Sequence, residues 1–259
     1  LMKQPINKKI LVSIIIPYHK KKLFFTSTID SIKNQIFKNY EVIVIYDDNS
    51  LKELSFVKEQ LKKIKNKKLI INKKIIGPGF SRNKGIKISK GKYISFCDAD
   101  DTWQKNKLSY QINFMIKNNL KFSHSNYNII NFGGKKIGNF MIEEQINYEN
   151  LLKSCDIGLS TVMVEKFFLE NYKFCGLKTK EDYYLWLKLV KKLKILHGIK
   201  KYLVNWRSLK NSLSSSKKQR IKDAYKLYNY YENYSGLLSF YYVLRLSFYS
   251  LIKKIKIYF

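Results

Sequence analysis

Three carboxylates stand within four positions of one another at the end of an apolar stretch, in the segment KYISFCDADDTW. They are Asp98, Asp100 and Asp101, in a chain whose formal net charge is +31. Neighbouring carboxylates repel one another and resist burial, so the cluster is most stable where a cation neutralises it. Magnesium and manganese bind through one or two carboxylates while substrate phosphates complete the shell. The cluster therefore predicts a divalent metal site. A solvated turn, or Asp101 capping a helix that starts at Thr102, is the structural alternative.

Two other segments carry groups that suit a phosphorylated nucleotide. YDDNS follows an earlier apolar run, and a carboxylate of Asp47 or Asp48 there can accept a hydrogen bond from a nucleobase N–H. GPGFSRNKG combines glycines such as Gly79, which permit close backbone approach, with Arg82, whose planar fork matches phosphate. Together with the carboxylate cluster, these segments indicate a nucleotide diphosphate bridged by a metal ion.

Alternating apolar runs and helical patterns must position these groups. Continuous β-branched runs predict strands buried on both faces, at residues 10–17, 41–46, 68–72 and 93–97. Helices are predicted between them, at 24–37, at 50–65 with a Ser50 cap, and after Gly77. This β-α-β order predicts an open α/β sheet with right-handed crossovers. Because ligands bind beyond the carboxyl ends of such strands, the polar segments should share one rim.

The second half is less regular. Apolar residues at helical spacing predict helices at residues 108–118, 180–193 and 217–234. Runs rich in strand-forming residues predict strands at residues 121–132 and 202–207. A hairpin turn is predicted at Gly133–Gly134, and STVMVEKFFLE is read as a strand leading into a helix. Glu181 and Asp182 open the helix at 180–193, where the helix dipole favours carboxylates and predicts a lowered pKa for Asp182.

The charge balance limits the classes of partner. Lys and Arg number 50 against 19 Asp and Glu, and no acidic residue occurs between Asp182 and Asp223. Such an excess attracts nucleic acid, an anionic membrane surface or phosphorylated substrates. The hydrophobic fraction of 45% is that of a folded chain and excludes a disordered protein. Charge alone leaves the three classes of partner open.

The cysteines and the first residues indicate the compartment. Cys97, Cys155 and Cys175 show no CxxC spacing and cannot pair completely, which fits a reducing compartment. The polar start of the sequence shows no secretory signal. We therefore expect a cytoplasmic protein.

The C-terminal stretch LLSFYYVLRLSFYSLIKKIKIYF differs in composition from the rest. It is apolar and aromatic, is interrupted by Arg245 and closes with three lysines. A membrane-spanning helix needs about 20 apolar residues, so this one is short. Aromatic and basic residues together favour a helix in the headgroup region of an anionic bilayer, with packing on the core or a dimer interface as the alternative.

Five segments occur in the order and approximate spacing of a known family: VSIIIPYHK, YEVIVIYDDNS, GFSRNKGIKISKGKYISFCDADDTW, KEDYYLWLKL and WRSLKNSLS. In these segments the chain resembles the family 2 glycosyltransferases of bacterial surface polysaccharide synthesis. The resemblance covers about residues 10–215. It implies the GT-A fold, a Rossmann-like and mostly parallel sheet flanked by helices. It also implies that a sugar is transferred, with inversion, from a nucleotide sugar to a hydroxyl of a glycan or lipid-linked acceptor. The implied cofactor is Mn²⁺ or Mg²⁺, and a UDP-sugar is the most favoured donor.

The resemblance also carries roles to single residues. Asp48 is similar to the carboxylate that reads the uracil ring, Asp98 to the first DXD acid at the ribose, and Asp100 to the metal ligand. Arg82 resembles a basic contact to the nucleotide. The residues implied at the donor are Pro17, Tyr18, Asp47, Asp48, Gly79, Arg82, Asp98 and Asp100.

Catalytic roles are implied for the segment KEDYYLW and for a later one. Asp182 is similar to the catalytic base, with Glu181 as the alternative. The motif around Arg207 and Ser212–Ser214 resembles a flexible segment that closes near the donor. A positioned carboxylate is needed because an acceptor hydroxyl is a poor nucleophile until its proton is removed.

The expected organisation has two parts. Residues 8–215 form the glycosyltransferase domain, with 8–103 as the nucleotide-sugar half and 104–215 as the acceptor half. Residues 216–259 form a helical, basic and aromatic segment for peripheral contact with the cytoplasmic face of the inner membrane or for oligomerisation. A homodimer is left open.

Two other functions compete with sugar transfer. A sugar-nucleotide pyrophosphorylase shares a related sheet, but it should open with a glycine-rich loop after the first strand, and IPYHKKK has no glycine. A non-enzymatic RNA-binding protein would use the positive charge, but recognisable basic and aromatic RNA motifs are absent, so no nucleic acid partner is expected.

Overall fold

The computed structural model describes residues 10–210 and 216–258, with the side chains of the last helix placed as far as Ile252. Strands and helices alternate through its first half. The strands are β1 (Val12–Tyr18), β2 (Tyr40–Tyr46), β3 (Lys67–Ile71) and β4 (Tyr93–Phe96). The helices are α1 (Lys22–Lys33), α2 (Leu51–Leu61) and α3 (Pro78–Ile88). The four strands are parallel in the order β3-β2-β1-β4, as the predicted helical crossovers require.

The second half extends the same sheet with shorter strands. They are β5 (Thr102–Trp103), β6 (Phe122–Ile130), β7 (Lys136–Phe140), β8 (Gln145–Ile146), β9 (Met163–Glu165) and β10 (Leu196–Arg207). The helical elements are α4 (Lys107–Lys117), α5 (Tyr148–Lys153), η1 (Leu159–Thr161), α6 (Lys166–Asn171) and α7 (Glu181–Leu193). Thr102 therefore begins a strand, and the alternative in which Asp101 caps a helix there is wrong.

The strand order explains how the two halves join. Within the described residues the sheet runs β3-β2-β1-β4-β9-β6-β10-β5, with β7 beside β6 and β8 beside β10. β9 lies antiparallel between β4 and β6, whereas β10 runs parallel to β6. The predicted α/β fold is confirmed, with a parallel first half and mixed directions beyond β4. The predicted hairpin turn joins β6 to β7, and Gly134 there has a φ of +87°, which favours glycine.

Two hydrophobic cores lie on opposite faces of the sheet. Side chains alternate along β1, so Ile14 and Ile16 enter the core shared with α1, α2 and α4, while Ile15 enters the core shared with α3 and α7. Trp103 belongs to the first core and Trp186 to the second. Both tryptophans are buried, so neither is available to stack on a sugar.

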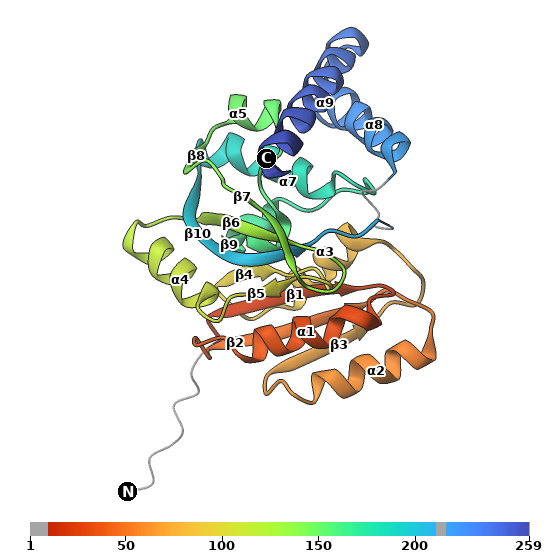
Figure 1. Ribbon diagram of the computed structural model, residues 1–259, viewed down its shortest axis with the longest axis vertical. Coiled ribbons are helices and arrows are strands. Elements are labelled where there is room, and N and C mark those ends of the chain that lie inside the picture. The colour runs from red at the N-terminus through yellow and green to blue at the C-terminus, as the bar shows by residue number, and fades with distance from the viewer. Residues whose placement is uncertain (1–9, 211–215, 259) are drawn as a thin grey trace, which may run out of the picture.

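The C-terminal helices pack on the second core. α8 (Lys217–Lys226) continues into a π-helical turn, η3 (Leu227–Tyr231), and is followed by α9 (Gly236–Tyr258). The helix predicted at 217–234 thus ends early. Leu227, Val243 and Leu246 are buried in the core that contains α7. In Figure 1, α8 and α9 lie at the opposite end of the molecule from α2. No helix in the described part of the chain is both long enough and apolar enough to cross a bilayer.

Candidate active site

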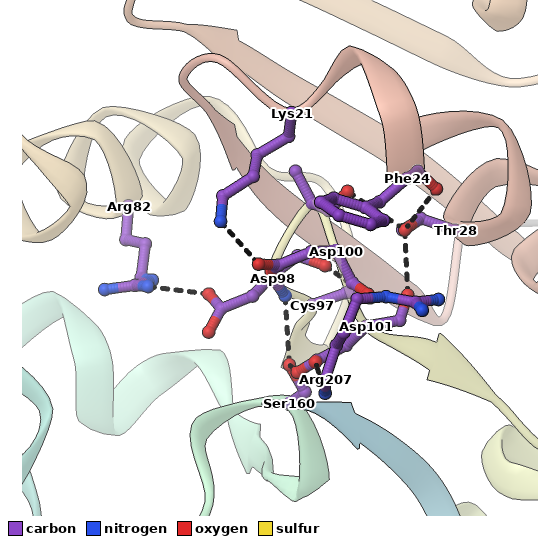
Figure 2. Close-up of polar contacts among 11 residues, drawn as sticks. Lys21, Phe24, Thr28, Arg82, Cys97, Asp98, Asp100, Asp101, Ser160 and Arg207 are labelled. Atoms are coloured by element: carbon purple, nitrogen blue, oxygen red, sulfur yellow. Dashed lines mark hydrogen bonds and ion pairs between the residues drawn. The ribbon is translucent and has the colours of Figure 1, made fainter. Parts of the chain in front are cut away.

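The predicted rim forms at the carboxyl ends of β1, β2 and β4. Asp98, Asp100 and Asp101 follow β4 and point to three different partners, as Figure 2 shows. Asp98 meets Arg82 from α3, Asp100 meets Lys21 at the start of α1, and Asp101 contacts Ser160. The cluster is therefore not a solvated turn, because protein cations and a hydroxyl satisfy its charges.

Arg82 links the carboxylate cluster to the helix that carries the predicted base. Its Nη2 lies 2.8 Å from Asp98 Oδ1, and its Nη1 lies 2.7 Å from Glu181 Oε1 at the start of α7. The arginine is only 4% exposed. Both terminal nitrogens of the guanidinium thus contact carboxylates, and the contact of Arg82 with the nucleotide stays a prediction. Its role here is to position Asp98 and Glu181.

The carboxylate of Asp100 is held by an ammonium group. Lys21 Nζ lies 2.5 Å from Asp100 Oδ2, and the two side chains are 26% and 14% exposed. Burial raises the pKa of Asp100, and Asp98 adds to this, while Lys21 opposes it. Asp98 is the more open acid of the pair, with a side chain 33% exposed. Sequence reasoning missed Lys21, because no local pattern relates it to a residue 79 positions away.

Asp101 is a structural residue at the centre of the site. It is 1% exposed, and its oxygens accept hydrogen bonds from Ser160 Oγ at 2.6 Å and from the backbone N–H of Arg207 at 2.9 Å. Its carbonyl accepts a third from Thr28 Oγ1 at 2.8 Å. Burial, together with Asp100 and Asp98, raises the pKa of Asp101 well above its usual range. Asp101 therefore joins α1, η1 and β10 to the end of β4.

Arg207 is also fixed, contrary to its predicted place in a flexible segment. It ends β10 and is 7% exposed. Its Nε donates to the Asp100 carbonyl at 2.9 Å, and its Nη1 donates to the carbonyls of Asn131 and Phe132. These bonds tie Arg207 to the residues that follow β4 and β6. Ser212–Ser214, the other part of that predicted segment, lies outside the described residues.

Asp47 and Asp48 organise the loops at the end of β2. Asp47 is 3% exposed and accepts hydrogen bonds from Asn72 Nδ2 and from the backbone N–H groups of Ile76 and Gly77. Asp48 accepts three backbone N–H groups, one of them from Lys20 at 2.9 Å. Burial opposes the ionised form of Asp48, but these N–H groups and His19 hold its pKa below the usual value. Asp48 therefore stays an acceptor.

Three other predicted donor residues fall in different environments. Pro17 lies near the end of β1 and is partly exposed, as a lining residue should be. Tyr18 is fully buried, and its hydroxyl donates to Glu53 at 2.6 Å, so only the backbone of this residue could fulfil the prediction that its segment lines the nucleotide. A Cβ on Gly79 would lie 2.9 Å from the Cys175 carbonyl and 3.1 Å from Glu181 Cγ. The small size of Gly79 thus permits the close approach of Glu181 and the Cys175 carbonyl, and its place at the nucleotide stays a prediction.

The two candidate bases, Glu181 and Asp182, begin α7. Burial and the neighbouring Asp182 raise the pKa of Glu181 to about 7, although Arg82 opposes this shift. Burial also raises the pKa of Asp182, against the attraction of Arg82 and Lys180. The predicted lowering at Asp182 is therefore wrong, because the cost of desolvating its charge exceeds the benefit of the helix dipole. Raised values suit a base that works near neutral pH.

Asp98 and Asp100 fit a metal ion that arrives with a diphosphate. Among the described residues, no three side chains of His, Cys, Asp or Glu gather as a complete cation site. In the same part of the chain, each carboxylate forms an ion pair through one oxygen, Asp98 Oδ1 with Arg82 and Asp100 Oδ2 with Lys21. Two carboxylates are enough for Mg²⁺ or Mn²⁺ when phosphate oxygens complete the shell.

Comparison with known proteins identifies the class that this fold and site define. Residues 13–169 match the profile of Glycosyl transferase family 2. Over 185 residues the chain is 38% identical to the UDP-Glc:alpha-D-GlcNAc-diphosphoundecaprenol beta-1,3-glucosyltransferase WfgD of Escherichia coli, with 70% of each chain covered. The chain therefore belongs to glycosyltransferase family 2 and is a glycosyltransferase, as its motifs predicted.

Solved structures show the same fold at low sequence identity. S. aureus TarS 1-349 in complex with UDP-GlcNAc superposes with a TM-score of 0.68 at 19% identity, over 90% of this chain and 70% of that chain. The mannosyltransferase PcManGT from Pyrobaculum calidifontis, in complex with GDP-Man and Mn²⁺, superposes with a TM-score of 0.65 at 12% identity, over 92% and 70%. The GT-A fold predicted for the chain is confirmed.

Proposed function

We propose that this glycosyltransferase is inverting and metal-dependent, and that it moves a sugar from a UDP-sugar to a hydroxyl of a lipid-linked or surface-glycan acceptor. The observation that carries the proposal is the bridge of Arg82 between Asp98 and Glu181. The buried Arg82 guanidinium thereby holds Asp98, which is proposed to face the donor, next to the start of α7, where the two candidate bases lie. A direct displacement needs both parts, a stabilised leaving group and a base for the acceptor proton.

The donor is bound by residues at the ends of β1, β2 and β4. Pro17 lines the nucleotide, and Asp48, ionised and with acceptor capacity left, takes the uracil N–H. Asp98 lies at the ribose, and Asp100 would hold the metal, which when bound neutralises charge on the departing diphosphate. UDP is the first choice because the relative WfgD is named for UDP-Glc, and TarS was solved with UDP-GlcNAc. A metal is supported by Mn²⁺ in PcManGT.

Transfer depends on the residues that begin α7. Asp182 removes the acceptor proton as the hydroxyl attacks, and Glu181 keeps Arg82 in place. The acceptor lies over residues 104–215, and the donor over residues 8–103. A lipid diphosphate acceptor is supported by WfgD, whose name contains a diphosphoundecaprenol substrate.

The C-terminal segment 216–259 keeps the enzyme at the cytoplasmic face of the membrane. Along α9 one stripe of apolar side chains is more than half exposed: Leu237, Tyr241, Leu244, Phe248 and Leu251. The opposite face packs Val243 and Leu246 on the core. No acidic residue follows Glu232, and the sequence ends with several lysines. An apolar stripe in a basic surrounding matches an anionic bilayer, where apolar burial and charge attraction act together.

Calorimetric titration tests the proposed donor and metal. We expect UDP to bind more tightly with Mn²⁺ than without it, and more tightly than GDP or dTDP under the same conditions. Equal binding with and without Mn²⁺ would contradict the metal assignment. Absence of binding by all three nucleotides at about millimolar concentration, where such affinity is measurable, would contradict the donor class.

A further inference from the structure

The ion pair of Lys21 with Asp100 brings a protein cation to the carboxylate proposed to bind the metal. Lys21 Nζ lies 2.5 Å from Asp100 Oδ2, and among the described residues no second ion pair engages the Asp100 carboxylate. An ammonium group has three donors, and this contact uses one of them. In Figure 2 the lysine extends from α1 across to the carboxylates that follow β4.

The backbone around Lys21 is built to hold it there. Lys20 has a φ of +50°, in the left-handed region that non-glycine residues rarely adopt. Its N–H donates to Asp48 Oδ2 at 2.9 Å, and the Lys21 carbonyl accepts the N–H groups of Phe24 and Phe25 at 3.0 Å. Hydrogen bonds on either side of the Lys20–Lys21 peptide hold this strained backbone in place and so set the direction in which the Lys21 side chain leaves it. The placement of Lys21 is therefore a property of the fold.

A divalent ion and this ammonium group cannot share Asp100 at full strength. Mg²⁺ binds oxygen at about 2.0–2.1 Å, so an ion on Asp100 would lie close to Lys21 Nζ and be repelled. The repulsion is relieved when the lysine finds another anion nearby. The diphosphate of the donor supplies one, and Lys is suited to follow it because its charge sits on a flexible stem.

We propose that Lys21 is a resident counter-cation of Asp100, displaced by the metal and then transferred to the donor diphosphate. Lys21 thereby couples the binding of metal and nucleotide. A metal ion alone must compete with Lys21 for Asp100, whereas a nucleotide bound with the metal gives Lys21 a new anionic partner. This inference rests on the proposed function. It makes Lys21 a positioning residue that sets the order and cooperativity of metal and donor binding.

The test is Mn²⁺ binding without nucleotide, measured by the paramagnetic resonance signal of free Mn²⁺. For Lys21→Met we expect affinity for Mn²⁺ alone to rise about tenfold, a size typical of coupling between two ligands, and affinity for UDP with Mn²⁺ to fall. Lys21→Arg keeps the positive charge and should keep weak binding of Mn²⁺ alone. Lys22→Met is the matched control, because Lys22 is the exposed neighbour, 5.6 Å from the Phe56 ring, and should leave both affinities unchanged.

The outcomes separate this inference from the proposed function. If the wild type binds UDP with Mn²⁺ but Lys21→Met leaves the affinity for Mn²⁺ alone unchanged, Lys21 forms only a surface ion pair and the inference is overturned. A rise in that affinity in Lys22→Met as large as in Lys21→Met would overturn it as well, since any lost charge would then suffice. If neither the wild type nor Lys21→Met binds Mn²⁺ with UDP, the proposed function itself fails.

Discussion

Arg82 and Glu181 lie 99 positions apart in the chain and meet at 2.7 Å, with both side chains buried. The contact joins α3 to α7, and the same guanidinium reaches Asp98 on its other side. Asp98 and Glu181 thus share one buried guanidinium. Gly79 allows the contact, because any side chain there would collide with Glu181 or with the Cys175 carbonyl.

The first prediction concerns this shared support. Arg82→Met removes the partner of two carboxylates, and breaking a buried ion pair typically costs about 3–5 kcal/mol of unfolding free energy. We expect urea denaturation to show a loss of this order, together with loss of transfer. Lys87→Met, at an exposed position on the same helix, should change stability by less than about 0.5 kcal/mol. Native stability in Arg82→Met would mean that the bridge is not formed in solution.

The second prediction assigns the base. Asp182→Asn should lower kcat by about 10²–10⁴-fold, the range of general base catalysis, and leave the dissociation constant of UDP with Mn²⁺ within about twofold of wild type. Glu181→Gln should lower kcat and also weaken the binding of UDP with Mn²⁺, because it disturbs Arg82 and, through Arg82, Asp98. Near-normal turnover in Asp182→Asn would transfer the role of base to Glu181.

The third prediction is the pH dependence of transfer. A base must be ionised, and burial raises the pKa of Glu181 to about 7 and also raises the pKa of Asp182. We expect kcat to fall as the pH drops through the raised pKa of Asp182, with tenfold loss per pH unit at the acid end when one group controls the rate. Measurement of kcat between about pH 5.5 and 9 at saturating donor checks this. A flat profile down to about pH 5 would contradict raised pKa values in this pair.

The fourth prediction concerns metal binding by Asp100. Asp100→Ala removes the proposed metal ligand together with the ion-pair partner of Lys21, so calorimetry should show UDP binding that no longer depends on Mn²⁺. Ser109→Ala, on the exterior of α4 and outside the site, is a suitable control. Unchanged Mn²⁺-dependent affinity in Asp100→Ala would disprove its role as ligand.

The fifth prediction uses a buried lysine outside the site. Lys107 is fully buried, with Nζ 2.9 Å from Ser95 Oγ, 2.6 Å from Gln111 Oε1 and 4.0 Å from the centre of the Trp103 ring. Burial lowers the pKa of Lys107 to about 7, below its value of about 10.4 in an unfolded chain. Between these values the unfolded chain binds a proton that the folded protein lacks. Lys107 therefore adds a contribution to the unfolding free energy that rises with pH.

Substitution isolates this contribution. Relative to Lys107→Met, the wild type should gain up to about 1.4 kcal/mol of unfolding free energy per pH unit above pH 7. Urea denaturation of both proteins at several pH values measures the difference. Lys117→Met, an exposed lysine of the same helix, should show no such trend. A constant difference between Lys107→Met and wild type would mean that Lys107 is charged or hydrated in the folded protein.

Sequence alone determined the class of fold and the neighbourhood of the site. The apolar runs of β1, β2 and β4 are local signals of a parallel sheet, and ligand groups at their carboxyl ends follow from its topology. The Ser50 cap is also local, and its hydroxyl accepts the N–H of Glu53 as predicted. Such features depend on residues near one another in the chain, which is why their pattern could be interpreted without coordinates.

Tertiary structure alone decided what each polar group does. Arg82 lies between two carboxylates, and Lys21 reaches Asp100 across 79 positions of sequence. The raised pKa of Asp182 has the same origin, since burial is set by everything packed around α7 and outweighs the local dipole of the helix. Ion pairing and desolvation depend on distances between segments remote in sequence, so only the folded chain could determine these roles.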